Sequence, residues 1–514
     1  MYARPIQLLD FCPDADDRTP GMIKDMDGFV GTVAGLRTVP SFVPVASLPL
    51  PSLGSYTATM PSGDQFTVAG TQDHLYKLMG TSWIPFDSGQ TFNTGSRWRF
   101  TTFGVDVLAV NGSDPPQVSS NELPFVPLAT HKPNPSYADP PISSIVETAN
   151  PGVFLILPRS DQYYFSGISD AIWTVGTPAA IATETVTARL QATQGPITAF
   201  HRIRGGVVAY KTNSMYFGQF TGPPFFWQFT AISENVGTLT NEMVINAADV
   251  HLFLANDDFY MFDGSTLQRI PNQVKGWFFS HVNPAYLDRT LGGWDAPNSL
   301  AIWYFSSLEA DPPGALDQML MWNMRTGKWT KARPRTSDGV PFNVQDVVQP
   351  NSVIDNSLTY RTFGELFDRY SDIPDITYAN DLFGGPFNEV PGVFNGGNGL
   401  MLRNGPSVGG TLLSGEIGDG FSYFQISRLR PIFEQWPADN AGHIQTYRRR
   451  IFGFPIPDTN PFRLPFLGQQ AWLTKRDGCF NFIVTARSHQ WRMSFSALTE
   501  ITSWSLDMTE VGTE

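Results

Sequence analysis

The chain has 514 residues, of which 41% are hydrophobic, 13% aromatic and only 16% charged, and its net charge is −13 at pH 7. The hydrophobic content excludes a disordered chain, and the acidic balance argues against a protein that holds nucleic acid tightly through its phosphates. No run of about 18 apolar residues occurs, and the first residues lack the apolar core of a signal peptide. We therefore expect no membrane insertion, and synthesis in a cytoplasm.

The low content of charged residues carries a second implication. A typical soluble domain has about 25% charged residues, and protein interfaces are depleted in charge and enriched in aromatic side chains. The composition therefore favours a protein that gives much of its surface to partners. A surface rich in Ser, Thr and Asn is the alternative interpretation.

Turn-forming residues are abundant along the whole chain, with 46 Gly and 41 Pro, which predicts many short strands rather than long elements. A unit repeats over the first 330 residues: a hydrophobic strand, a tight polar turn, an aromatic strand and a strand that often carries Trp. Equivalent positions in the unit are spaced by 40, 47, 53, 45 and 50 residues, and they are Val68, Leu108, Leu155, Val208, Phe253 and Trp303. This spacing is typical of four-stranded propeller blades.

The fold expected from these patterns is all-β: a β-propeller of about six to seven four-stranded blades, a smaller antiparallel β domain and a long irregular excursion. A seventh blade could use 358–363, with the N-terminal segment supplying a closing strand. The expected parts are an N-terminal platform or closing strand, the propeller, a Gly/Pro/Asn-rich excursion or tip loop and a basic antiparallel region, at 1–50, 51–370, 371–420 and 421–514. A sandwich or solenoid with coincidental spacing is the alternative fold.

Positive charge concentrates near the C-terminus. Between Phe421 and Arg492 there are ten basic and four acidic residues, which gives this segment +6 and leaves −19 for the remainder. One interpretation is a solvated strand face, and the other is a surface that faces an acidic partner or passing DNA. The residues assigned to this possible interface or channel are Arg428, Arg430, Arg448, Arg449, Arg450, Arg487 and Arg492.

The sequence offers no convincing catalytic motif. Gly405-Pro406-Ser407-Val408-Gly409 matches a nucleophile elbow, but it lies in a glycine-rich stretch without the strand and helix that this motif needs. The acids at 14–17 and 256–258 are common in caps and turns. The seven histidines are scattered, and Cys12 and Cys479 are far apart. We therefore assign no catalytic residue, metal site, cofactor or disulfide, and expect no enzyme.

Three stretches resemble a known family. The opening at 28–41, the strand pair at 250–264 and the basic-aromatic strand at 485–493 are similar in style and order to the tail hub, or nozzle, proteins of short-tailed bacteriophages, which stabilise packaged DNA. The resemblance implies a virion protein, made in the host bacterial cytoplasm, that forms a homohexameric ring in the tail. It also implies that the ring extends the channel of the portal and adaptor proteins, retains packaged double-stranded DNA and conducts it at ejection. A needle or plug and fibres or spikes would be further partners.

Two other functions remain open at this stage. A secreted or surface β-propeller that binds or hydrolyses glycans would need an export signal or a pair of carboxylates at the propeller mouth. A phage baseplate or spike adaptor would have similar chemistry at another position in the particle.

Overall fold

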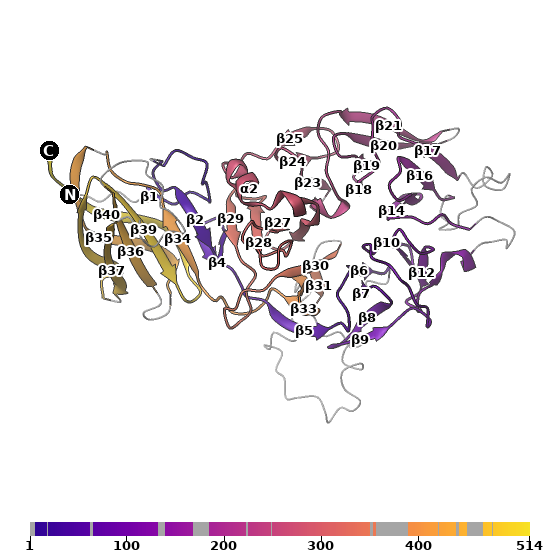
Figure 1. The fold of residues 1–514 in the computed structure, drawn as a ribbon, viewed down its shortest axis with the longest axis horizontal. Coiled ribbons are helices and arrows are strands. Elements are labelled where there is room, and N and C mark those ends of the chain that lie inside the picture. The colour runs from indigo at the N-terminus through magenta and orange to yellow at the C-terminus, as the bar shows by residue number, and fades with distance from the viewer. Residues whose placement is uncertain are drawn as a thin grey trace, which may run out of the picture.

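The computed structural model describes residues 6–513 apart from 18, 62–64, 132–138, 168–184, 223–224, 248, 350–352, 356–388, 420, 438–441, 450–465 and 475. Among these residues the architecture is all-β: a propeller joined to a second β domain (Figure 1). The one α-helix in the described part of the chain, α2 (Lys275–His281), connects two blades. No described helix is long and apolar enough to cross a membrane.

The propeller consists of antiparallel four-stranded sheets. Five are separate sheets, and a nine-stranded sheet contains two more, which meet where β30 pairs in parallel with β6. Blade 1 consists of β6 (Gly54–Thr59), β7 (Gln65–Gly70), β8 (Leu75–Met79) and β9 (Ser82–Pro85), and blade 2 of β10 (Arg99–Phe103), β11 (Asp106–Val110), β12 (Gln117–Ser120) and β13 (Val126–Pro127). Blade 3 consists of β14 (Ile145–Ala149), β15 (Gly152–Ile156), β16 (Gln162–Phe165) and β17 (Val186–Arg189), and blade 4 of β18 (Ala199–Ile203), β19 (Gly206–Tyr210), β20 (Met215–Gly222) and β21 (Phe226–Ser233). Blade 5 consists of β22 (Val244–Ala247), β23 (Val250–Leu254), β24 (Phe259–Phe262) and β25 (Leu267–Arg269), and blade 6 of β26 (Leu291–Asp295), β27 (Leu300–Phe305), β28 (Gln318–Asn323) and β29 (Trp329–Ala332).

The seventh blade combines distant parts of the chain. It contains β30 (Val344–Gln349), β32 (Glu389–Asn395) and β33 (Gly399–Leu402), with β31 (Val353–Asp355) beside β32, and its outer strand is β5 (Val43–Ser47) from near the N-terminus. The first strands of the seven blades contact one another in sequence around the axis and close the ring. The segment 358–363 that the sequence suggested for this blade lies outside the described residues.

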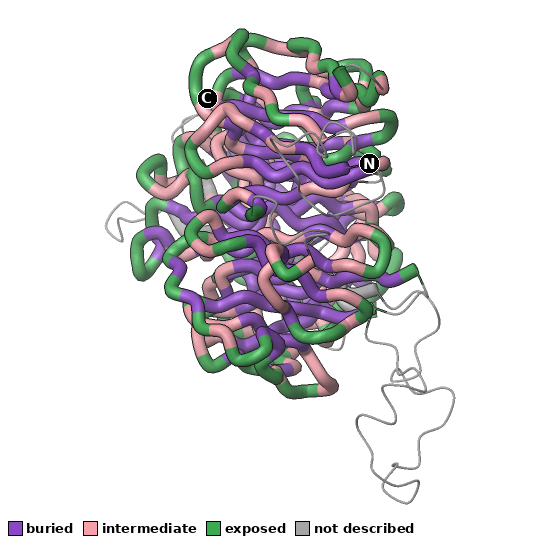
Figure 2. Tube along the Cα trace, turned by 90° about the vertical axis from the view of Figure 1, so that its right-hand side faces the viewer, coloured by how far each residue is buried: buried purple, intermediate pink, exposed green. Residues whose placement is uncertain are grey.

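The repeat read from the sequence is confirmed. All six equivalent positions lie on the second strand of successive blades, β7 to β27, and each is at most 1% exposed. Second strands are covered by neighbouring blades on both faces, and this explains their continuous hydrophobic sequence. Figure 2 shows these buried strands stacked inside a rim of exposed turns.

The second β domain is one eleven-stranded sheet that curls back on itself. Its order is β2-β34-β39-β36-β37-β38-β35-β40-β4-β3, with β1 also paired to β40. The strands are β1 (Ile6–Gln7), β2 (Ile23–Asp27), β3 (Phe29–Gly31), β4 (Leu36–Thr38), β34 (Gly410–Ser414), β35 (Ser422–Gln435), β36 (Gly442–Arg449), β37 (Phe466–Thr474), β38 (Cys479–Ala486), β39 (Ser488–Phe495) and β40 (Glu500–Thr513). Both chain ends therefore build this domain.

The strand pairing shifts the boundaries that the sequence suggested. The segment 1–50 divides, because β1 to β4 join the C-terminal sheet while β5 closes the propeller. The segment 371–420, expected to be irregular, contains β32, β33 and β34 in its described part. The cause is pairing between residues far apart in sequence, which local composition does not report.

The two domains share one core. A single hydrophobic cluster contains Trp303 and Trp329 of blade 6 together with Trp491 and Trp504 of the second domain. The ends of the curled sheet, β2 and β3, both contact β29, the outer strand of blade 6. The backbone of Phe11 also donates to the carbonyl of Trp329 at 2.9 Å. The core of the second domain is therefore continuous with the core of blade 6.

Candidate functional site

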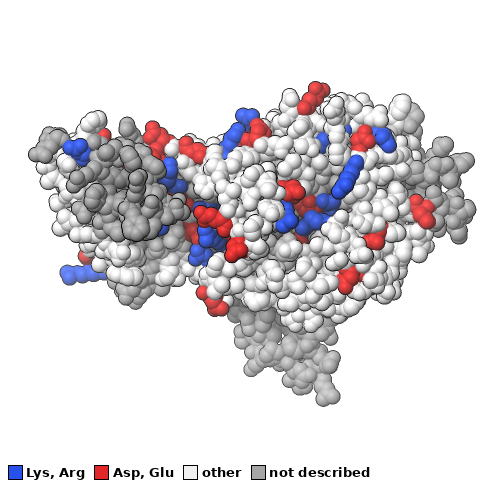
Figure 3. Space-filling view, in the orientation of Figure 1, with Lys and Arg blue, Asp and Glu red and all other residues white. Residues whose placement is uncertain are grey.

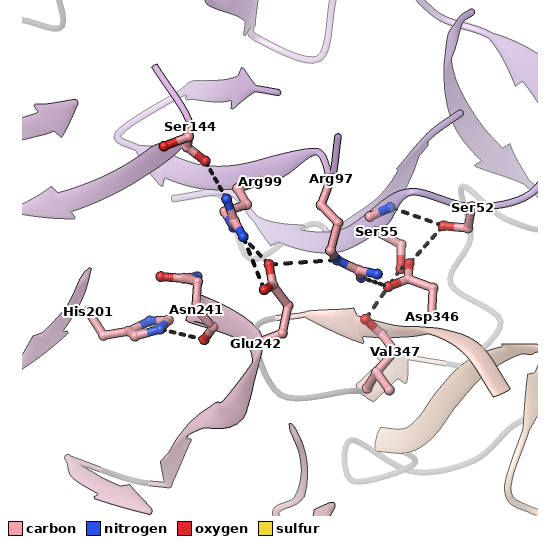
Figure 4. Close-up of polar contacts among 11 residues, drawn as sticks. Ser52, Ser55, Arg97, Arg99, Ser144, His201, Asn241, Glu242, Asp346 and Val347 are labelled. Atoms are coloured by element: carbon pink, nitrogen blue, oxygen red, sulfur yellow. Dashed lines mark hydrogen bonds and ion pairs between the residues drawn. The ribbon is translucent and has the colours of Figure 1, made fainter. Parts of the chain in front are cut away.

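Polar side chains at the propeller axis surround a cavity of about 370 Å³. The first strands of blades 1 to 5 reach this cavity, and Figure 4 shows side chains from several blades that converge on it. A cavity of this size is large enough for a small ligand.

An ion-pair network of four side chains crosses the axis. Arg99 contacts both carboxylate oxygens of Glu242, with its Nε 2.7 Å from Oε1 and its Nη2 3.0 Å from Oε2. Arg97 pairs with Asp346, and its Nε lies 3.6 Å from Oε1 of Glu242. The network, here called the axial cluster (Arg97, Arg99, Glu242 and Asp346), joins blades 2, 5 and 7 (Figure 4).

Two serine hydroxyls donate hydrogen bonds to the buried carboxylate of Asp346. Asp346 is fully buried and accepts hydrogen bonds from the hydroxyls of Ser52 and Ser55, both at 2.7 Å. Ser52 and Ser55 lie at the start of blade 1, so this carboxylate fastens blade 7 to blade 1 at the point where the propeller closes. A buried charge with several hydrogen bonds and a cation partner satisfies the requirement for burying a carboxylate.

The electrostatics of Glu242 fix its protonation state. Burial alone would raise the pKa of this carboxyl, but the adjacent Arg99 and Arg97 lower the pKa to about 2. Glu242 is therefore ionised at every physiological pH and has no proton to donate. A glycosidase needs a carboxylic acid with a raised pKa as its proton donor, and Glu242 has the opposite property.

Two histidines lie beside the same cavity. His201 lines it, with Nε2 3.0 Å from the carbonyl of Asn241 and Nδ1 3.7 Å from the carboxylate of Glu147. His251 lies behind it, where burial and the neighbouring His201 lower its pKa to about 3. Its Nε2 donates to the carbonyl of Arg202, so His251 is a neutral packed side chain between blades 4 and 5. No group of three or more His, Cys, Asp or Glu residues suited to a metal ion occurs in the described part of the chain.

A second cavity, of about 900 Å³, lies between the two domains. Asp14 sits at its edge and accepts hydrogen bonds from the backbone N–H of Gly276 and Trp277, at 2.6 and 2.8 Å. Lys331 bonds Asp25 at 2.6 Å and lies 5.1 Å from the centroid of the Trp277 ring. Asp14, one of the acids expected in a cap or turn, therefore ties the N-terminal segment to α2, and Asp25 ties the same segment to blade 6.

The other sequence candidates also have structural roles. Asp257 and Asp258 lie in the turn between β23 and β24, where Asp257 pairs with Arg269 at 3.0 Å. Ser407 of the nucleophile-like motif forms an isolated bridge with Pro40 and accepts from the backbone N–H of Gly409 at 3.2 Å. The two cysteines are free and buried.

The arginines assigned to an interface or channel are distributed over several strands and connections in the described part of the second domain. Arg428 and Arg430 are exposed on β35, whereas Arg492 lies on β39, which is separated from β35 by three strands. Arg428 contacts Asn481 and Asp507, and Arg487 lies over the ring of Tyr423 at 4.9 Å. The backbone of Arg448 and Arg449 belongs to β36, and Arg450 lies outside the described residues.

The axial cluster was missed at the level of sequence. Arg97 and Arg99 are close in sequence, but Glu242 lies 143 residues after Arg99 and Asp346 lies 249 residues after Arg97. The only signal available was that acidic and basic residues stand at the start of first strands in a chain that is otherwise poor in charge.

Comparison with known proteins bears on the fold alone. No family model and no curated protein matches this chain. Among solved structures, BamB from Moraxella catarrhalis is 8% identical with a TM-score of 0.36, over 78% of this chain and 97% of that one. The Pan2 WD40 domain of Neurospora crassa is 9% identical with a TM-score of 0.36, over 60% and 89%. A fungal alcohol oxidase in complex with copper is 9% identical with a TM-score of 0.38, over 90% and 93%. The strand order itself makes the described part of the chain an all-β protein with a β-propeller.

Proposed function

We propose that this chain is a structural protein of a short-tailed bacteriophage that forms the nozzle ring of the tail, extends the portal and adaptor channel and retains DNA until ejection. The observation that carries the proposal is the combination of a propeller locked across its axis with a second β domain that shares its core. A ring through which DNA leaves under pressure needs subunits that transmit force without internal hinges, and this architecture supplies such a subunit.

The axial cluster also constrains the path of DNA in this proposal. Its ion pairs span the axis of the propeller, and the axial cavity of about 370 Å³ is far too small for a duplex. DNA would therefore run between copies, along a channel formed by the outside of several subunits. The ring order and the surface that lines the channel follow from how copies meet, rather than from a pore within one chain.

The surface composition supports assembly over catalysis. Figure 3 shows a face on which uncharged atoms dominate and charges stand as isolated groups. Interfaces between permanent partners have this character. Within the axial cavity, Glu242 is unsuited to be the proton donor of a glycan-hydrolysing propeller, because its pKa is lowered to about 2.

The test is electron cryomicroscopy of intact particles from the source of this sequence, with the density of this chain located by its propeller. A ring of propellers coaxial with the portal is the expected result. Absence of the chain from particles, or single copies confined to fibres, would overturn the nozzle proposal. A glycan microarray with the purified chain then tests the alternative directly.

A further inference from the structure

One of the two longest strands of the second domain, β40, has an edge that is unpaired over much of its length among the described residues. β40 pairs with β35 along its whole length, but on its other side β4 and β1 pair only with its first five residues, up to Trp504. No described residue pairs with that side of 505–513. Beyond Leu506 the strand is exposed or half-buried, and Val511 is 56% exposed. Free strand edges are ready templates for pairing with another chain.

The propeller carries one comparable edge, on blade 4. Its outer strand β21 has eight residues, whereas the outer strands of the other six blades have two to five. β21 pairs only with β20 among the described residues. The hairpin that these two strands form carries exposed aromatic rings, with Phe225 76% and Phe220 37% exposed.

The two edges lie at opposite ends of the molecule. In Figure 1 the C-terminus that follows β40 is at one end of the long axis, and β21 is near the other end. One chain therefore cannot pair its own edges, but two copies can join head to tail. Such a contact uses different surfaces on each copy, and it closes into a ring when the rotation between copies permits.

Side-chain chemistry favours this pairing over pairing between two β40 edges. The free part of β40 contains two acids, Asp507, which lies 3.8 Å from Arg428, and Glu510, and two antiparallel copies of it would bring like charges together, which is destabilising. β21 has no charged side chain. Apolar side chains are also exposed beside both edges: Phe421 and Val511 at one, Phe220 and Phe225 at the other.

We propose that the free edge of β40 in one copy pairs with the edge of β21 in the next copy, so that blade 4 is extended by a fifth strand from its neighbour. The occupant of the β40 edge is thus a second copy of this chain. This inference rests on the proposed function, because it names the contact by which copies would form the ring.

Cross-linking of two single-cysteine chains tests the contact. Chains carrying Val511→Cys and Thr230→Cys are made separately with different tags, mixed, and treated with a short bis-maleimide. Cys12 and Cys479 are buried, so the wild-type chain reports the background. The expected product is a mixed dimer that either variant alone does not give. Equal dimer from Val511→Cys alone, or no mixed dimer, would overturn the proposal.

A charge series at Thr230 provides an independent measurement. Thr230 is exposed on β21. In the proposed contact, Thr230→Asp would place a negative charge opposite the acidic edge of β40, and Thr230→Lys would place a positive charge there. We expect the first to raise, and the second to lower, the dissociation constant of self-association by roughly two- to fivefold in mass photometry. Gln268→Asp on β25 is the matched control and leaves the constant unchanged. Identical constants for the two Thr230 variants would contradict the contact.

The outcomes separate the two proposals. A mixed dimer in solution together with absence of the chain from phage tails would reject the nozzle while the contact stands. A tail ring in which β40 and β21 of neighbouring copies lie far apart would reject the contact while the nozzle stands.

Discussion

The phenol of Tyr210 donates a hydrogen bond to Nδ1 of His251, 2.8 Å away, and both side chains are completely buried between blades 4 and 5. The direction of the bond follows from the other ring nitrogen, because Nε2 of His251 donates to the carbonyl of Arg202 at 2.9 Å. A polar pair thus links two blades inside an apolar cluster that contains Phe253 and Phe262.

Replacing Tyr210 by Phe should destabilise the propeller. The substitution keeps the ring but leaves Nδ1 of His251 buried without a donor, and an unsatisfied buried acceptor costs about 1–3 kcal/mol. Urea-induced unfolding followed by tryptophan fluorescence measures the loss. Tyr164→Phe, at a half-buried position in blade 3, is the control and should change the free energy of unfolding by less than about 0.5 kcal/mol. Equal effects of the two variants would show that the Tyr210–His251 bond contributes nothing.

His251 should make the protein less stable in acid. Its pKa is about 3 in the folded protein and 6.5 when exposed, so between these values the unfolded chain binds a proton that the folded chain does not. Stability from this residue is therefore complete above pH 6.5 and falls as the pH is lowered, by about 2 kcal/mol at pH 5. Unfolding of wild type at pH 7 and pH 5 measures this difference.

Replacing His251 by Leu isolates the contribution of its imidazole to the pH dependence of stability. His251→Leu should unfold more easily at pH 7 but should lose less stability between pH 7 and pH 5 than wild type does. Phe262→Leu, in the core of the same blade, should be destabilised yet keep the wild-type pH dependence, because it retains His251. If His251→Leu keeps the wild-type difference, another group titrates instead.

These contacts show what the sequence could and could not predict. The blade repeat was visible because second strands are buried on both faces, so that Val208 and Phe253 stand in continuous hydrophobic runs at regular spacing. The sequence also allowed the N-terminal segment to supply a closing strand, as β5 does, but it could not show which residues form that strand, because β5 pairs with β33 across about 350 residues of chain. A five-residue strand that contains a proline, an alanine and a serine carries no local signal for its partner.

The polar site was hidden for a related reason. The uneven distribution of charge along the sequence predicted an interface or channel at the arginines of the C-terminal third. In the structure, Arg428 and Arg492 lie on strands that the sheet order separates. The axial cluster instead joins Arg97, Glu242 and Asp346, one from each of three blades, and only the circular arrangement of blades brings them together. Composition reports how many charges exist, whereas topology decides which of them meet.

Removing the carboxylate of Asp346 should weaken closure of the propeller. Asp346→Ala leaves Arg97 without its nearest partner and two serine hydroxyls without their acceptor, and loss of one partner from a buried ion pair costs about 3–5 kcal/mol. Asp346→Asn should cost less, because the amide oxygen still accepts from the serines. Urea-induced unfolding compares these variants with Asp338→Asn at an exposed site. A loss no larger than that of the control would mean that the axial cluster does not stabilise the closed ring.

The N-terminal strand should act as a clasp for blade 7. Ala46 of β5 is buried and pairs with Leu400 of β33, so Ala46→Asp places a carboxylate against an apolar cluster that includes Phe394. Burial of an unpaired charge is strongly unfavourable, and we expect β5 to detach rather than accept it. Hydrogen exchange followed by mass spectrometry should then show faster exchange in β33 and β32 as well as in β5. Ser47→Asp, at the adjacent exposed position, should leave exchange in all three strands unchanged. Faster exchange confined to β5 would contradict the clasp, because it would show that blade 7 is complete without its N-terminal strand.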